Sequence, residues 1–133
     1  RSGAMGGRDT LPWIFQALSD PTRLRMFRLL ASSRAEMCVC EFVDSLQERQ
    51  YKVSRHLSAL ESAGLFRGVK DGRWTYYGID GQAPTVAAFS KFVAALPDAS
   101  GTFAEDQKRF NRRMALRDGG RCRCGIQTPQ LAR

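Results

Sequence analysis

Two short helical patterns joined by a polar connector constrain the fold of this chain more than any other feature. Apolar residues recur at helical spacing over residues 36–46 and again over 51–63. The four residues between them, 47–50, are polar, and Gly64 is well placed to end the second helix. Two short helices with such a brief connector predict a helix-turn-helix.

A hairpin signal follows this pair directly. Residues 65–79 alternate in character and are rich in β-forming residues, with an Asp-Gly pair at 71–72 in the middle of the run. Three further helical patterns lie over 11–18, 21–33 and 82–96. The order helix, helix, helix-turn-helix, hairpin, helix predicts a winged helix-turn-helix. This is a mainly α fold with a β-hairpin wing, and the second paired helix enters the major groove of DNA.

The 133 residues fit one domain with a tail. Residues 1–9 are Gly-rich and patternless, and we interpret them as a disordered, cloning-derived end. Residues 10–97 hold the winged-helix domain, and 98–117 contain a candidate for an additional helix. Residues 118–133 form a basic tail with two cysteines, and this tail has the composition of a flexible segment.

The net charge of +8 suggests an anionic partner, with nucleic acid as the first candidate. The charge is uneven, because residues 20–80 sum to only +2 while residues 105–133 sum to +5. No uncharged stretch exceeds ten residues, which excludes a transmembrane helix, and no signal argues for secretion. We therefore expect a cytoplasmic protein. The sequence has no nucleophile, base and anion cradle in one place, which argues against an enzyme.

The four cysteines form two Cys-X-Cys pairs, Cys38 with Cys40 and Cys122 with Cys124. Disulfides or surface thiols are one interpretation, but Cys-X-Cys bridges are strained, so functional thiols in a reducing compartment fit better. Residues i and i+2 of an ideal helix lie about 200° apart. The first pair can therefore face one ion only if its helix unwinds or begins later. The alternative is one buried small hydrophobe and one exposed thiol.

Several motifs resemble the ArsR/SmtB family of winged-helix metalloregulatory repressors, in the family's order and spacing. They are LSDPTRL at 18–24, MCVCEF at 37–42, KVSRHL at 52–57, LESAGL at 60–65 and KDGRWTYY at 70–77. The resemblance covers roughly residues 11–97. It implies a homodimer that binds an inverted-repeat operator in double-stranded DNA and releases it when a metal or metalloid binds.

The Cys-Val-Cys motif resembles the arsenite- and antimonite-sensing members, which implies As(III) or Sb(III) as the inducer and no organic cofactor. Those members commonly carry a third cysteine three residues further on, where this chain has Val43. Soft trivalent ions prefer thiolates, and three sulfurs suit them best. We therefore expect Cys122 or Cys124 to complete the site of Cys38 and Cys40, from the same chain or from the dimer partner.

Other interpretations of the tail cysteines stay open. In the first alternative, the tail pair is disordered and binds ions adventitiously. In the others, it forms a second site, or joins the first pair in a tetrahedral site for Cd, Pb or Zn. Family members that sense Cd or Pb add cysteines from an N-terminal extension, and residues 1–37 contain none. The family's zinc site on the dimerisation helix is absent, because residues 82–96 lack Asp, Glu and His. We expect Arg121 and Arg123 to lower the pKa of the tail thiols. A thiol redox-sensing repressor is the competing function.

The second helix of the pair and the wing tip carry the residues expected to contact DNA, since glutamine can read adenine and arginine or lysine can read guanine. These residues are Gln50, Tyr51, Lys52, Ser54, Arg55, His56, Lys70 and Arg73. His56 has a second interpretation as a buried, hydrogen-bonded histidine. Apolar stripes of two other helices are expected at the dimer interface, with the core of one chain as the alternative for each. Their residues are Leu11, Ile14, Phe15, Phe89, Phe92 and Val93.

Overall fold

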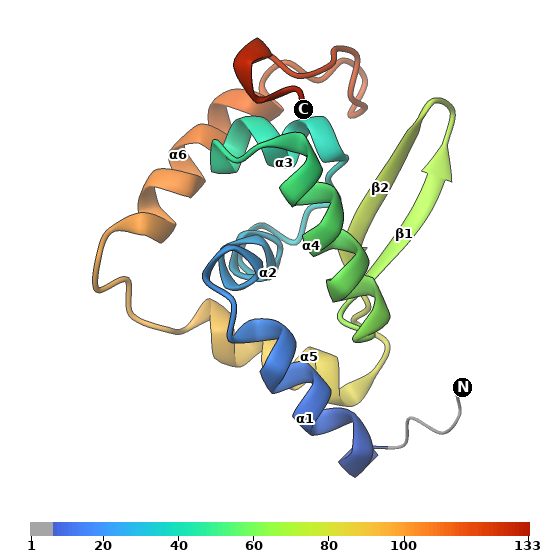
Figure 1. Cartoon of the computed structure of the whole chain (residues 1–133), viewed down its shortest axis with the longest axis vertical. Coiled ribbons are helices and arrows are strands. Elements are labelled where there is room, and N and C mark those ends of the chain that lie inside the picture. The colour runs from blue at the N-terminus through green and yellow to red at the C-terminus, as the bar shows by residue number, and fades with distance from the viewer. Residues whose placement is uncertain (1–6) are drawn as a thin grey trace.

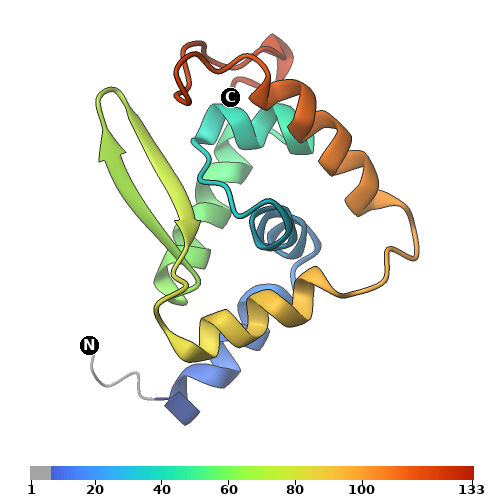
Figure 2. The same ribbon diagram turned by 180° about the vertical axis from the view of Figure 1, so that it is seen from behind.

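The computed structural model describes residues 7–133, with side chains from residue 11, and has the predicted winged helix-turn-helix (Figure 1). Its elements are α1 (Gly7–Leu18), α2 (Pro21–Ser33), α3 (Val39–Leu46), α4 (Gln50–Ser62), β1 (Phe66–Asp71), β2 (Trp74–Ile79), α5 (Pro84–Ala94), α6 (Thr102–Met114) and the 3-10 turn η1 (Pro129–Leu131). Helix α2 lies in the middle, with the other elements around it (Figures 1 and 2). Within the described residues, no helix combines the length and the apolar character needed to cross a membrane.

The core forms between α2, the helix-turn-helix and the wing. Phe66 of β1 stacks with Phe27 of α2 and with Phe42 of α3, at ring centroid distances of 6.1 and 6.2 Å. Leu57 and Leu60 of α4 belong to the same buried cluster. Burial of such apolar side chains is the main favourable term in folding. It fixes one side of α4 on the core and leaves the opposite side to solvent.

Local signals set two of the element boundaries as the sequence predicts. The Asp20 carboxylate accepts the backbone N–H of Arg23 at 3.0 Å, which caps α2 just before Pro21 at its first position. Gly64 has a φ of +78°, the left-handed conformation that turns the chain from α4 into the wing.

The start of α3 is later than predicted. The helix begins at Val39 and not at residue 36, because Met37 pairs with Tyr77 of β2 through two backbone hydrogen bonds of 3.0 and 2.8 Å. A two-stranded sheet alone is marginally stable. This extra pairing ties the wing to the linker between α2 and α3.

Other boundaries differ by smaller amounts. Helix α4 starts one residue earlier than predicted and ends at Ser62. The hairpin turn is formed by Gly72 and Arg73, since Asp71 still pairs with Trp74. Helix α1 begins at Gly7, so the last part of the segment expected to be disordered is helical, while residues 1–6 lie outside the described residues.

The C-terminal part continues the fold. Helix α6 packs along α3, and the residues after it turn back over α3 towards the start of α4 (Figures 1 and 2, red). Ile126 and Leu131 pack against the core cluster. The tail, which we expected to be flexible from its composition, is therefore packed on the domain.

Truncation of a core residue of α4 tests this packing. Leu57 is 1% exposed, so Leu57→Ala is expected to lower the free energy of unfolding by about 2–5 kcal/mol. The neighbouring Ser58→Ala, on the exposed side of α4, is expected to change it by less than about 0.5 kcal/mol. Urea denaturation followed by circular dichroism measures both. Equal effects would contradict the described orientation of α4.

Candidate metal centre and nucleic-acid interface

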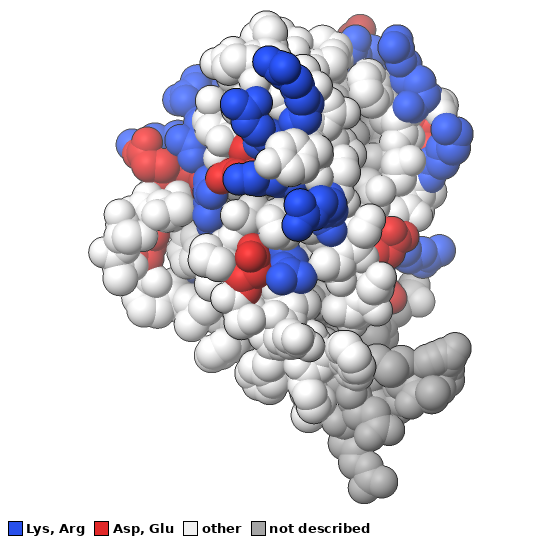
Figure 3. Space-filling model, viewed as in Figure 1, with Lys and Arg blue, Asp and Glu red and all other residues white. Residues whose placement is uncertain are grey.

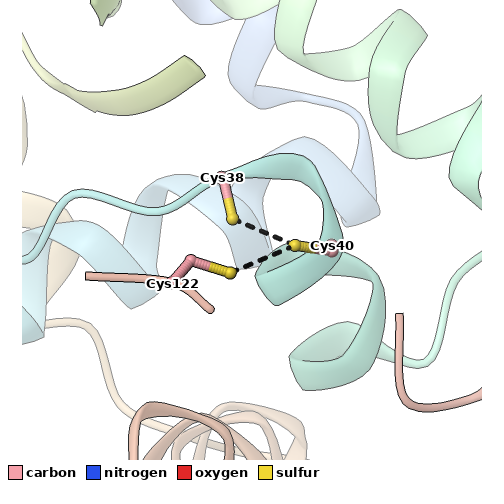
Figure 4. Close-up of side chains that lie close together, drawn as sticks. All are labelled: Cys38, Cys40 and Cys122. Atoms are coloured by element: carbon pink, nitrogen blue, oxygen red, sulfur yellow. Dashed lines mark hydrogen bonds between the residues drawn. The ribbon is translucent and has the colours of Figure 1, made fainter. Parts of the chain in front are cut away.

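Three cysteine sulfurs meet in one buried cluster (Figure 4). The Sγ atom of Cys40 lies 3.1 Å from that of Cys38 and 3.5 Å from that of Cys122. All three sulfurs lie within 4.8 Å of one another. Two come from the start of α3 and the third from the segment after α6 of the same chain. The fold thus brings three thiols close enough to share one soft ion.

The late start of α3 explains how Cys38 and Cys40 converge. Cys38 precedes the helix in an extended conformation, with φ −90° and ψ 170°, and Cys40 lies in the first helical turn. The two sulfurs therefore do not point about 200° apart, as they would if both residues lay within an ideal helix. The backbone N–H of Cys38 donates to the Glu41 carboxylate at 3.1 Å, which holds the residue at the helix end.

The tail places Cys122 in contact with the wing. Its backbone N–H donates to the Tyr76 hydroxyl at 3.0 Å, and Tyr76 is itself 3% exposed. Trp74 and Ile126 pack against the same cluster. The Sγ of Cys124 lies outside the group of three. Its backbone carbonyl lies beside the cluster, 3.1 Å from Cys122 Sγ and 3.6 Å from Cys40 Sγ.

Two ion pairs lie near the cluster, and they join α3 to Arg113 of α6 and to Arg117 just after α6. Glu41, fully buried, accepts two hydrogen bonds of 2.8 Å from Arg117. Asp44 lies 2.6 Å from Nε of Arg113, and both side chains are buried. Each of these two buried carboxylates is therefore matched by one guanidinium.

The environment raises the pKa of two of the three thiols. The hydrogen bond with Cys40, burial and the charge of Glu41 raise the pKa of Cys38. Burial, followed by a hydrogen bond with Cys38, raises the pKa of Cys122. The expectation that Arg121 and Arg123 lower the pKa of the tail thiols is thus wrong for Cys122, since burial raises the pKa of this thiol.

The guanidiniums near the cluster are not the ones that the sequence suggested. Arg121 lies over the ring of Tyr76 and pairs with Asp71 at 3.1 Å. The Nη2 of Arg113 lies 3.9 Å from Cys122 Sγ instead. The spacing of Glu41 and Asp44 places both on one face of α3, while their partners Arg113 and Arg117 lie on α6 and just after it. Only the tertiary packing brings the two faces together.

Most of the predicted DNA-contacting residues lie on an open surface. Figure 3 shows Lys and Arg side chains over the upper part of this face, where α4 begins and along the wing. Gln50 is half-buried at the start of α4. The predicted DNA-contacting residues with exposed side chains are Tyr51, Lys52, Ser54, Arg55, Lys70 and Arg73.

His56 points away from that surface. Its side chain is 20% exposed, and its Nε2 lies 3.9 Å from the Asp20 carboxylate at the start of α2. Burial lowers the pKa of His56, and the charge of Asp20 opposes this effect only in part. The packed interpretation of this histidine therefore fits the structure.

The residues expected at the dimer interface divide into two groups. Leu11, Phe15 and Phe92 are exposed large hydrophobics, and Phe89 packs edge-on against Phe15 with ring centroids 5.1 Å apart. The part of the surface over α1 and α5 is almost free of charge in Figure 3. Ile14 and Val93 instead belong to the core of the single chain, which is the alternative interpretation of these residues. Trp13 of α1 is a further exposed apolar residue, 55% exposed.

Comparison with known proteins agrees with the winged helix-turn-helix fold. The sequence pattern of the family described as "Bacterial regulatory protein, arsR family" matches residues 20–67. The arsenic resistance transcriptional regulator ArsR2 of Pseudomonas putida is 42% identical over 76 residues, which is 57% of this chain and 65% of that regulator, just under two thirds. An uncharacterized HTH-type transcriptional regulator of Methanocaldococcus jannaschii is 44% identical over 64 residues, 48% of this chain and 71% of its own length. The homodimeric winged helix-turn-helix DNA-binding domain from Mycobacterium bovis superposes with a TM-score of 0.57 at 29% identity, covering 70% of this chain and 81% of that one.

Alkylation tests the environment of the thiols. The thiolate is the reactive form, so burial and a raised pKa slow the reaction of Cys38 and Cys122 with iodoacetamide near neutral pH. Cys124 is only partly buried and is expected to react first. Peptide mass spectrometry over time gives the order, and modification of Cys122 before Cys124 would contradict the packed tail.

The buried ion pair of Asp44 and Arg113 has an exposed counterpart for comparison in Asp71 and Arg121. Asp44→Asn leaves a buried guanidinium without its partner and is expected to lower the free energy of unfolding by about 3–5 kcal/mol. Asp71→Asn is expected to lower it by less than about 1 kcal/mol. Urea denaturation measures both, and the account fails if the two substitutions cost the same.

Proposed function

Because the chain belongs to the ArsR family of bacterial regulatory proteins, we propose that this regulator responds to arsenic(III) or antimony(III). In this proposal a homodimer binds operator DNA and dissociates when the trivalent ion bonds to Cys38, Cys40 and Cys122. The observation that carries the proposal is the cluster of three buried sulfurs within 4.8 Å of one another. Soft thiolate ligands select soft ions.

The charge balance of the cluster supports a trivalent ligand. Arsenous acid, As(OH)₃, is uncharged. Three S–H and three As–O bonds break, three As–S and three O–H bonds form, and three water molecules leave. Three thiols and arsenous acid are uncharged, and so is the product, and the exchange involves no oxidation or reduction. A neutral product suits a buried position where the nearby carboxylates are already paired with arginines.

A divalent ion fits the same cluster less well. Three thiolates around Cd²⁺, Pb²⁺ or Zn²⁺ leave one net negative charge in a buried place, and Arg113 and Arg117 already have carboxylate partners. A tetrahedral site would also require the sulfur of Cys124, which lies outside the group of three.

Thiol oxidation is the second candidate, and the short sulfur–sulfur distances of 3.1 and 3.5 Å favour it. With peroxide as the oxidant, two thiols give one disulfide and two water molecules. Intact-protein mass spectrometry separates the candidates. Arsenite adds one arsenic and removes three hydrogens, whereas oxidation only removes two hydrogens.

The position of the cluster offers a route to the DNA-reading helix. Two of the sulfurs lie at the start of α3, which packs against both α4 and α6. Bonds across this point favour the form of the protein in which the three sulfurs are together. If DNA favours another form, ligand affinity and DNA affinity fall by the same factor in each other's presence.

Substitution of single cysteines tests the proposed ligand set. In the wild type, arsenite is expected to weaken binding to a duplex selected from random sequences by about 5- to 150-fold. Cys38→Ser, Cys40→Ser and Cys122→Ser are each expected to abolish this response while DNA binding without arsenite remains. Fluorescence anisotropy of a labelled duplex measures all four proteins.

Cys124→Ser is the matched control, because its sulfur lies outside the group of three. It is expected to respond to arsenite like the wild type. A normal response of Cys122→Ser, or a lost response of Cys124→Ser alone, would refute the ligand set. No response of the wild type to either arsenite or antimonite would refute the proposed function.

A further inference from the structure

The residues from Cys122 to the end of the chain, 122–133, run from the sulfur cluster across α3 to the start of α4 (Figure 1). We call them the C-terminal strap. The family pattern ends at residue 67, so the strap lies outside the part of the chain that it matches. Its two ends contact the candidate ligand site and the helix expected to read DNA.

Asp44 of α3 anchors the middle of the strap. Both of its carboxylate oxygens accept the backbone N–H of Gln127 at 3.0 Å, and one accepts the Thr128 hydroxyl at 2.9 Å. Its partner Arg113 donates to two strap carbonyls, at 3.0 and 3.1 Å. Hydrogen bonds to charged groups are stronger than neutral ones. The strap is therefore held by a buried ion pair on the body of the domain.

The far end of the strap occupies the start of α4. Residue Arg49, just before the helix, makes no side-chain capping bond. The Arg133 carbonyl instead accepts the backbone N–H of Tyr51 at 3.2 Å, and the Gln130 carbonyl accepts Nη1 of Arg49 at 3.1 Å. One of the free N–H groups of the helix start is thus taken by the strap.

The same end of α4 is where we expect contact with DNA. Tyr51 and Lys52 are exposed there, and the guanidinium of Arg49 is suited to a phosphate. While the strap is in place, the N–H of Tyr51 and the Nη1 of Arg49 are engaged with strap carbonyls. A DNA phosphate cannot take these groups without displacing the strap.

Without a ligand, the near end of the strap is held by noncovalent contacts alone. Cys122 contacts Cys40 through a sulfur–sulfur approach of 3.5 Å and bonds to Tyr76 through its backbone N–H. Thiols are weak hydrogen-bond donors and acceptors. A covalent bond from the ligand to this sulfur would tie the near end to α3.

We propose that the C-terminal strap and operator DNA compete for the start of α4, and that bonding of the trivalent ligand to Cys122 fixes the strap in place. The proposal rests on the proposed function, since it needs Cys122 as a ligand. When the strap is in place, the three sulfurs are together and the start of α4 is engaged. The ligand therefore favours this form of the protein. DNA selects the state in which the strap is released, and the two therefore oppose each other.

A weakened strap tests the direction of this coupling. Thr128→Val in the full chain removes the hydroxyl that bonds to Asp44 and accepts from Gln47, at a partly exposed position. Operator affinity without arsenite is expected to rise by about two- to tenfold, the worth of one hydrogen bond. The arsenite concentration for half release is expected to rise as well.

Thr128→Ser retains the hydroxyl and is expected to behave like the wild type. A lower or unchanged operator affinity of Thr128→Val would overturn the proposal, because a strap that supports α4 would weaken DNA binding when loosened. Anisotropy with the selected duplex measures the three proteins, and circular dichroism confirms that each is folded.

Amide hydrogen exchange in the wild-type protein gives a second measurement that needs no substitution. Strap amides, including those of Cys122, Gln127 and Leu131, are hydrogen-bonded in the free protein. Their exchange is expected to become faster with the duplex and slower with arsenite. Slower or unchanged strap exchange in the DNA complex would overturn the proposal.

The two proposals fail in different ways. If arsenite and antimonite both leave wild-type DNA binding unchanged, the proposed function fails and the strap proposal fails with it. If arsenite releases the wild type but Thr128→Val matches the wild type in both titrations, only the strap proposal fails.

Discussion

The beginning of α3 at Val39 is the constraint on which the site depends. A helix that began before Cys38 would point the two sulfurs about 200° apart. Glu41 holds the observed boundary, because its buried carboxylate accepts the N–H of Cys38 at 3.1 Å and two bonds from Arg117 at 2.8 Å. One side chain therefore fixes the start of α3, the approach of two sulfurs and the position of Arg117 just after α6. The wing supports the same boundary through the pairing of Met37 with Tyr77.

The ion pairs that join α3 to α6 and to the residue Arg117 after it set the geometry more than they add to stability. Removing two charges from water costs about as much as their attraction returns, so such pairs contribute little net stability. A wrong register, however, would leave Glu41 or Asp44 buried without a partner, which costs far more. The pairs thus select one position of α6 on α3. That position determines where the chain after α6 can run, and it brings Cys122 to the pair on α3 and Asp44 to Gln127.

Sequence patterns predicted the local elements well and the long-range placement of the tail poorly. The helix-turn-helix, the wing and the cap at Asp20 follow from spacing and from residue types that act over a few positions. The third sulfur was expected from the tail because the chemistry asks for one. The residues that hold the tail in place were not predicted, since the contacts of Arg113 with Asp44 and of Tyr76 with Cys122 join residues far apart in the chain. The pKa of Cys122 rises where we expected it to fall, because tertiary packing buries this thiol.

The central claim is that Cys122 provides the third sulfur of the ligand site. X-ray absorption at the arsenic edge counts the sulfurs around bound arsenite directly. The account predicts three sulfur neighbours in the wild type and in Cys124→Ser, and two sulfurs with one oxygen in Cys122→Ser. Three sulfur neighbours in Cys122→Ser, or a fourth sulfur lost only in Cys124→Ser, would contradict it.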